Sequence, residues 1–118
     1  MAGYSVRAGT GWRETFWLGR RTDKWRADDF DIYLQIKLTG SDGADAALIE
    51  ASTLNGRVTI VDPVSRRVEV NIAWTEIADL QARSCEFDFL LINKTTEARE
   101  RSVTHTLTVL RGITQKDD

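Results

Sequence analysis

The regular alternation of apolar and polar side chains is the feature that most constrains how this chain can fold. In residues 29–40 every second position is apolar: Phe30, Ile32, Leu34, Ile36 and Leu38 alternate with Asp31, Tyr33, Gln35 and Lys37. Successive side chains of a strand point to opposite faces of a sheet, so this period of two predicts a strand with one buried face. An amphipathic helix would need apolar residues three and four positions apart.

The same alternation recurs along most of the chain. Residues 66–74, 85–93 and 101–113 repeat it, and shorter apolar stretches at 14–21, 46–54 and 57–61 bring the expected number of strands to about seven. Residues 75–84 break the pattern and predict one short helical turn, which can carry the chain between two sheets. Many short strands without a long helix favour an all-β fold, as an antiparallel sandwich or a small barrel.

Two dipeptides indicate turns between neighbouring strands. Asn55-Gly56 is typical of a two-residue β-hairpin, because both residues tolerate positive φ. Asp62-Pro63 begins a second turn. We therefore expect the three strands around these turns to form a meander. The threonine-rich final strand, residues 101–110, is our candidate for an edge that pairs with a neighbour, since threonine suits a strand without requiring burial.

Length and composition indicate one soluble domain. The 118 residues, 42% hydrophobic and 29% charged, suffice for a single β-sandwich domain spanning 1–118, with frayed ends at about 1–9 and 115–118. No apolar run reaches the roughly 18 to 20 residues of a membrane span, and Met1–Arg13 does not resemble a signal peptide. We expect an intracellular product that is not secreted and has no membrane partner. A net charge of −2 makes nucleic acid an unlikely partner of the whole molecule.

The residues that usually carry catalysis or metal binding are scarce. One cysteine, Cys85, and one histidine, His105, cannot supply a structural zinc site, and Cys85 has no partner for an internal disulfide. The expected roles are a small, half-buried hydrophobic side chain with an inert thiol and a partly buried structural histidine. Neighbouring Asp28, Asp29 and Asp31 do not have the spacing of a calcium loop. No nucleophile motif or phosphate loop is present, so we expect no enzyme activity, no cofactor and no metal.

Basic and aromatic residues gather in the N-terminal quarter. The candidate interaction residues are Trp12, Trp17, Arg20, Arg21, Trp25 and Arg26. Tryptophan and arginine are the usual anchors of protein interfaces, which is the favoured interpretation. The same side chains could pack as tryptophan edges under arginine stems, or could stack on and neutralise single-stranded nucleic acid. Exposed tryptophans would also suit a carbohydrate- or host-surface-binding module, for which Trp25→Ala would be the control in a glycan screen.

The order of these segments resembles a known family. The matching segments are GTGWRETFWLGR, DDFDIYLQIK, ALIEAST, NGRVTIVDPVSRRVEVNIAWTEIADL, CEFDFLLIN and HTLTVLRGIT, which together cover about residues 10–114. They are similar to the small immunoglobulin-like β-sandwich proteins and modules of tailed-phage and prophage tail or baseplate assemblies. The chain departs from that pattern in its basic 20–28 loop and in a polar 93–100 loop where a tight Asp-Gly turn is usual.

The resemblance implies an antiparallel immunoglobulin-like sandwich and a structural role. It implies a non-enzymatic component of a phage or prophage tail or baseplate particle, made in the bacterial host cytoplasm and located in the virion or phage-like particle. Its partners would be other phage tail proteins, and it would form a homo-oligomer. It supplies no catalytic residue and no cofactor. The alternatives are a nucleic-acid-binding protein or an assembly accessory protein, either of which would use the basic, tryptophan-bearing N-terminal segment.

Overall fold

The computed structural model describes residues 3–7, 10–40, 47–80, 83–102 and 104–110. In chain order the elements are β1 (Gly3–Arg7), β2 (Trp12–Trp17), a 3-10 turn η1 (Ala27–Asp29), β3 (Phe30–Leu38), β4 (Ile49–Ser52), β5 (Val58–Asp62), β6 (Arg67–Ile72), α1 (Trp74–Asp79), β7 (Ser84–Asn93), β8 (Arg99–Arg101) and β9 (His105–Leu110). No helix among these residues is long and apolar enough to cross a membrane.

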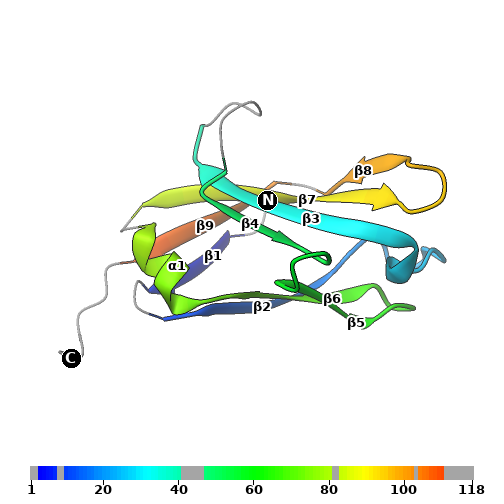
Figure 1. Cartoon of the computed structure of the whole chain (residues 1–118), viewed down its shortest axis with the longest axis horizontal. Coiled ribbons are helices and arrows are strands. Elements are labelled where there is room, and N and C mark those ends of the chain that lie inside the picture. The colour runs from blue at the N-terminus through cyan, green and yellow to red at the C-terminus, as the bar shows by residue number, and fades with distance from the viewer. Residues whose placement is uncertain (1–2, 8–9, 41–46, 81–82, 103, 111–118) are drawn as a thin grey trace.

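The strands form two sheets that face each other across one core (Figure 1). The larger sheet has the order β1-β9-β7-β3-β4, with β8 added to β7, and the smaller has the order β2-β6-β5. These orders correspond to the two sheets of an immunoglobulin-like sandwich, with β4 as the strand that variable-type domains add beside the third strand. With β4 left out of the count, the second strand pairs with the fifth and the third with the sixth, as in that fold. The expected all-β, immunoglobulin-like sandwich is confirmed.

Alternating strands supply the core. In β3 and β7, which pair along their length, the apolar residues of one face are buried apart from the exposed Leu38, and Ile32, Ile36 and Phe89 are almost fully buried. The smaller sheet contributes Phe16 of β2, whose ring centroid lies 5.0 Å from that of Phe89. Cys85 is fully buried, where half-burial was expected, and burial raises the pKa of its thiol. Edge-to-face contacts of this kind stabilise an aromatic core beyond the area buried.

The N-terminus is more ordered than the sequence indicates. The expectation of a frayed segment up to about residue 9 is wrong, because residues 3–7 form β1, which pairs in parallel with β9. Val6 is buried, and the Tyr4 ring lies 5.2 Å from Phe16. These contacts stabilise β1, a strand that the sequence pattern of residues 3–7 is too short to predict. The residues 115–118, also expected to be frayed, lie outside the described residues.

Final-strand and turn predictions also need correction. The expected strand 101–113 is divided between β8 and β9. Val103 and residues 111–113 lie outside the described residues. The strand β9 lies between β1 and β7, so the predicted edge at 101–110 is wrong for β9. The Asn55-Gly56 turn joins β4 of one sheet to β5 of the other, so the meander is wrong. Asn55 Oδ1 accepts hydrogen bonds from the Ser52 and Arg57 amides, which bends the chain across the sandwich.

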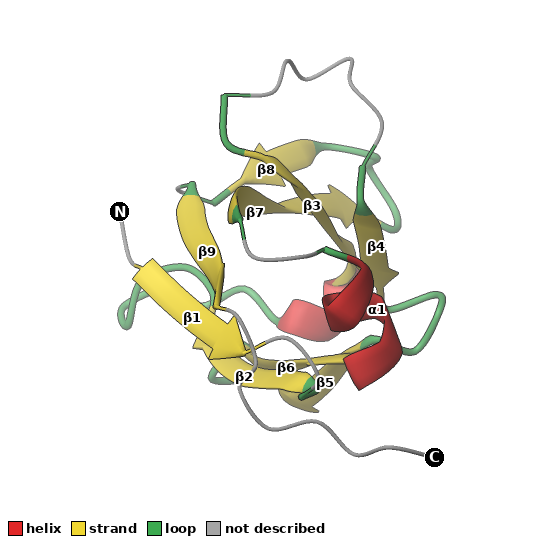
Figure 2. Cartoon of the chain, turned by 90° about the vertical axis from the view of Figure 1, so that its left-hand side faces the viewer, coloured by secondary structure: helices red, strands yellow, loops and turns green. Residues whose placement is uncertain are grey.

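Two other connections agree with the sequence. The Asp62-Pro63 turn joins β5 to β6 as an antiparallel hairpin, and Asp62 Oδ1 accepts hydrogen bonds from the amides of Val64 and Ser65. The helix α1 leads from β6 in the smaller sheet to β7 in the larger, across one end of the sandwich (Figure 2). Its Ile77 is buried, which fixes this crossing against the core.

Candidate functional site

The strand β2 forms one edge of the smaller sheet, and its sequence determines what that edge presents. β2 pairs with β6 alone among the described strands. Leu18 N–H donates to Arg66 C=O at 3.0 Å, so the amides of even-numbered β2 residues face β6. The N–H and C=O groups of Arg13, Thr15 and Trp17 therefore face away from the sheet. The Trp17 side chain is 63% exposed on the outer face.

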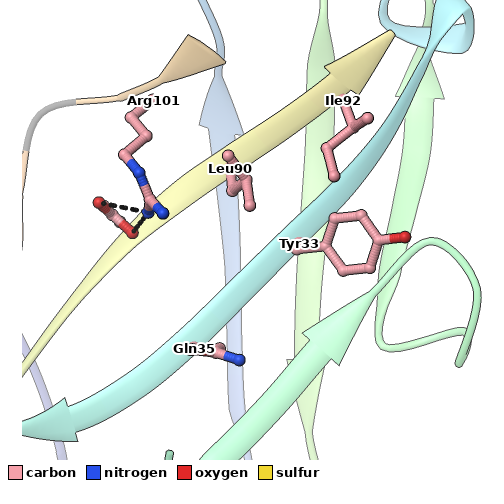
Figure 3. Close-up of a pocket in the computed structure, with 6 residues that line it drawn as sticks. Tyr33, Gln35, Leu90, Ile92 and Arg101 are labelled. Atoms are coloured by element: carbon pink, nitrogen blue, oxygen red, sulfur yellow. Dashed lines mark hydrogen bonds and ion pairs between the residues drawn. The ribbon is translucent and has the colours of Figure 1, made fainter. Parts of the chain in front are cut away.

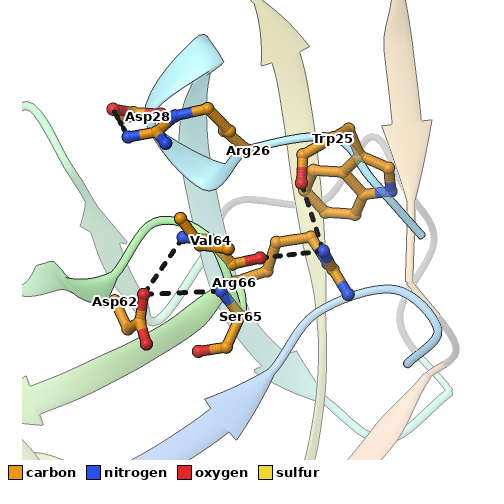
Figure 4. Close-up of polar contacts among 7 residues, drawn as sticks. All are labelled: Trp25, Arg26, Asp28, Asp62, Val64, Ser65 and Arg66. Atoms are coloured by element: carbon orange, nitrogen blue, oxygen red, sulfur yellow. Dashed lines mark hydrogen bonds and ion pairs between the residues drawn. The ribbon is translucent and has the colours of Figure 1, made fainter. Parts of the chain in front are cut away.

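A buried arginine holds the loop that follows β2. Arg66 is 4% exposed and has φ 60°. Its guanidinium donates to five backbone carbonyls at 2.6–3.2 Å, those of Leu18, Arg20, Asp23, Trp25 and Val64. Figure 4 shows two of these bonds, to Trp25 and Val64. Guanidinium donors are fixed in one plane, so a loop that surrounds them takes one shape.

Trp25 belongs to this arrangement as well. Its ring lies 5.1 Å from the Arg66 guanidinium carbon and 5.2 Å from the Phe30 centroid. The Asp23 carboxylate accepts the Arg20 amide at 2.6 Å, and this bond, helped by the Trp25 indole, lowers the pKa of Asp23. Gly19 adopts φ +74°, and a Cβ there would lie 2.6 Å from the Trp25 ring. The half-buried Trp25 therefore stabilises the loop.

A cleft of ≈ 710 Å³ opens between this end of β2 and the larger sheet. Its walls come from both sheets, from the loop after β2 and from the β8–β9 connection. The lining residues used below are Phe16, Trp17, Arg20, Phe89, Leu91 and His105. The lining combines apolar core side chains with a charged rim, which suits a polypeptide segment better than a small polar metabolite.

His105 lines the cleft as an imidazole ring, beside the phenol of Tyr4. Its centroid lies 5.2 Å from Phe87 and 5.7 Å from Tyr4. Burial lowers the pKa of His105 below 6.5, and its Nδ1 atom is buried with no hydrogen-bond partner among the described residues. An imidazole between aromatic rings is held neutral, because desolvation penalises the charged form. It acts here as a polar member of an aromatic wall.

The structure places the six predicted interaction residues in different environments. Trp17, Arg20 and Trp25 line the cleft together. Arg21 lies in the adjoining hollow of ≈ 620 Å³, beside Val64. The other two do not join them: Trp12 is 3% exposed in the core, and exposed Arg26 forms a two-fold hydrogen-bonded ion pair with Asp28. Trp12 is therefore a core residue and not part of a surface.

Sequence reasoning missed several residues that shape the site. Arg66 has no local signal, because it lies in the β5–β6 turn region and its acceptors are more than forty residues earlier in the chain, apart from Val64. Leu91 and His105 were predicted to face the core but not to line an opening. Their alternation indicated the inner face correctly. The opening arises because the smaller sheet, which ends at β2, does not cover the whole inner face of the larger sheet.

A smaller hollow of ≈ 290 Å³ lies on the outer face of the larger sheet (Figure 3). Tyr33, Leu90 and Ile92 line it, and its charged side chains are already paired. Arg101 forms an ion pair with Asp88 at 3.4 Å. Gln35, on the same face, donates to Glu50 at 3.1 Å. The Arg101, Asp88 and Gln35 side chains of this hollow therefore already have polar partners within the protein.

No group of metal-ligating side chains occurs within the described ranges. Within the acidic 28–31 segment, the Asp28 carboxylate pairs with Arg26. The described geometry thus offers an open strand edge, an aromatic cleft and a rigid basic loop. These features are suited to protein binding. No protein-family model matches this chain, and no curated protein matches it.

Proposed function

We propose that this chain is a structural, protein-binding subunit of a phage or prophage tail or baseplate particle. In this proposal it carries out no reaction, and it assembles with copies of itself and with other tail proteins. The resemblance of residues 10–114 to the immunoglobulin-like modules of such particles motivates the proposal. It would be made in the host cytoplasm and retained in the particle.

The exposure of the Trp17 side chain is the observation that carries the proposal. This side chain is 63% exposed on an edge strand, beside a loop whose shape Arg66 fixes. An exposed tryptophan on a rigid frame loses little conformational entropy on binding, and tryptophan is enriched among the residues that dominate interface energies. Arg20 and Arg21 are exposed next to it. This arrangement supports docking through a preformed surface.

The geometry favours a protein partner over single-stranded nucleic acid. Stacking on bases needs several exposed aromatic faces along a basic groove. Of the three N-terminal tryptophans, Trp12 is buried and Trp25 is packed against Phe30 and Arg66. One exposed ring is a poor platform for successive bases. A salt titration separates the two partners, because affinity from several phosphate contacts collapses with added salt, whereas a tryptophan-centred contact weakens little.

The test is to purify phage-like particles from the source cell by density gradient and to measure this chain by mass spectrometry. We expect a stoichiometric copy number in finished particles. Trp17→Ala should reduce incorporation by about tenfold or more, the size of effect typical of an interface anchor. Trp74→Ala is the matched control, since Trp74 is 58% exposed on α1, and incorporation should be unchanged. A chain that is expressed but absent from finished particles would contradict the structural role.

A further inference from the structure

The two sheets of the sandwich are unequal, and the difference lies beside β2. The larger sheet has six strands and the smaller has three. β2 ends the smaller sheet, so its Arg13, Thr15 and Trp17 backbone groups have no strand partner among the described residues. Unpaired edge groups of this kind are a template for another strand. The β2 edge therefore offers backbone N–H donors and C=O acceptors to an added strand.

The cleft provides a place for the side chains of such a strand. A strand added to β2 would point alternate residues inward, toward Phe16 of β2 and toward Phe89 and Leu91 of the larger sheet. Those three residues line the cleft, and His105 adds a neutral ring to the same wall. Backbone pairing along β2 and apolar pockets beside it would act together, which is the arrangement used in recognition by β-augmentation.

Charge at one end of the cleft selects the sequence of the incoming strand. The loop after β2 carries Arg20, Arg21 and Lys24 against the single carboxylate of Asp23. The Asp23 carboxylate already accepts the Arg20 amide, and Arg20 and Arg21 form no ion pair with another described residue. An acidic residue at the matching end of the strand would complement this basic rim.

The structure favours a strand from a different protein over the β2 strand of a second copy. Trp12, Glu14 and Phe16 lie on the inner side of β2. Burial, together with the nearby Glu14 carboxylate, raises the pKa of Tyr4. Any antiparallel pairing of two β2 strands that matches their inner sides sets Glu14 opposite itself or opposite an apolar residue. Either pairing leaves a partly buried carboxylate without compensation.

We propose that β2 is the acceptor for one extended strand of a partner protein, with apolar residues opposite Phe16 and Leu18, a hydroxyl residue opposite Glu14, and acidic residues beside Arg20 and Arg21. The proposal deepens the proposed function and rests on it, because it names the form in which a particle protein would dock. It can fail while the chain still proves to be a particle component, since the binding test below uses no particle.

The probe is the synthetic peptide Asp-Asp-Val-Thr-Val-Thr-Thr-Thr, designed to pair antiparallel with residues 18 to 13 and to place its two aspartates beside the loop that begins at Gly19. Amide hydrogen exchange of the full chain is measured by NMR with and without the peptide. The amides of Arg13, Thr15 and Trp17 should become protected. Exchange at Phe16 should change little, because its amide already faces β6. Replacing the two aspartates with lysines should weaken binding about threefold or more at low salt.

Two pairs of variants separate the edge from the rest of the surface. Thr15→Pro removes one edge donor and should weaken peptide binding about tenfold or more. Its control is Val61→Pro, at the bulge on the opposite edge strand β5, which should leave binding unchanged. Arg21→Glu should weaken binding about threefold, and Lys94→Glu in the 93–100 loop is its matched control.

The amide spectrum of each variant reports its fold, and Arg21→Glu keeps the test valid if Thr15→Pro does not fold. Absence of protection at the three edge amides with millimolar peptide overturns the proposal. Equal binding by Thr15→Pro and Val61→Pro also overturns it. Protection that increases with protein concentration in the absence of peptide would show self-pairing, and it would overturn the assignment of a different protein as partner.

Discussion

The 20–28 loop and the 93–100 loop are both rich in polar residues, yet they are built differently. The 20–28 loop surrounds Arg66, the residue before β6, whose guanidinium donates to four carbonyls of residues 18–25. The second is a local turn in which Asn93 Oδ1 accepts the amides of Thr95 and Thr96, both at 2.9 Å. Its residues 94–100 are all exposed.

This difference teaches how a charged loop acquires a fixed surface. A buried guanidinium with several acceptors couples the 20–28 loop to the core, so the loop cannot change shape without exposing unsatisfied groups. The asparagine turn depends on neighbours in sequence, apart from the Lys94 amide, which donates to Asp29 C=O at 3.0 Å, and its opening would leave the core intact. A rigid docking surface is therefore expected at the first loop and a locally adjustable one at the second.

The largest expected effect is that of Arg66→Ala. It would leave five carbonyls without their donor, so we expect a loss of about 3–5 kcal/mol in the free energy of unfolding. Chemical denaturation measures it. Arg66→Lys should restore only part, because an ammonium has fewer donors and no planar fork. A loss below about 1 kcal/mol for Arg66→Ala would mean that the two loops are equally independent of the core.

The next effect is that of Gly19→Ala, compared with Gly40→Ala. Both glycines have positive φ, but a Cβ at Gly19 would lie 2.7 Å from Asp23 Oδ2 as well as against Trp25, whereas nothing lies within 4 Å at Gly40. We expect Gly40→Ala to cost about 1 kcal/mol from backbone strain and Gly19→Ala about 1–2 kcal/mol more. Thermal unfolding of both variants measures the difference, and equal values would refute the crowding of the first loop.

A smaller effect is expected in the second loop from Asn93→Ala. Loss of its side-chain acceptor should reduce global stability by only about 0.5–1 kcal/mol, because the turn is exposed. Amide exchange at Thr95 and Thr96 should accelerate while that of the β3 and β7 core stays unchanged. Slower folding or exposure of the core would instead mean that this loop, like the first, is coupled to the sandwich.

The smallest effect is the response of the first loop to acid. Hydrogen bonding from the Arg20 amide lowers the pKa of Asp23 below 3.8. The stability that its carboxylate contributes is therefore present above pH 3.8 and lost as the pH falls through the lower folded-state pKa. A carboxyl-carbon NMR titration should place the Asp23 midpoint below 3.8, with the Trp25 indole shift following it. A midpoint at or above 3.8 would contradict this hydrogen bonding.

Part of the candidate site could be read from the chain alone. The alternation in residues 14–21 placed Phe16 and Leu18 on one side and Trp17 on the other, and the structure agrees. The same reasoning did not separate Trp12 from Trp17, although both lie on β2. One faces the core and the other faces outward, because their positions differ by an odd number of residues on a strand whose start the sequence leaves undefined.

The sequence by itself determined the class of fold, because period-two alternation is a local consequence of how side chains project from a strand. It also placed a short helical turn within residues 75–84, where α1 spans Trp74–Asp79, and the turn at Asp62-Pro63. Only the tertiary structure decided that Asn55-Gly56 joins strands of different sheets, that β1 pairs with β9, and that Arg66 binds the backbone of the 20–28 loop. Those outcomes depend on which distant backbone groups meet, and such long-range pairing leaves no periodic mark on the chain.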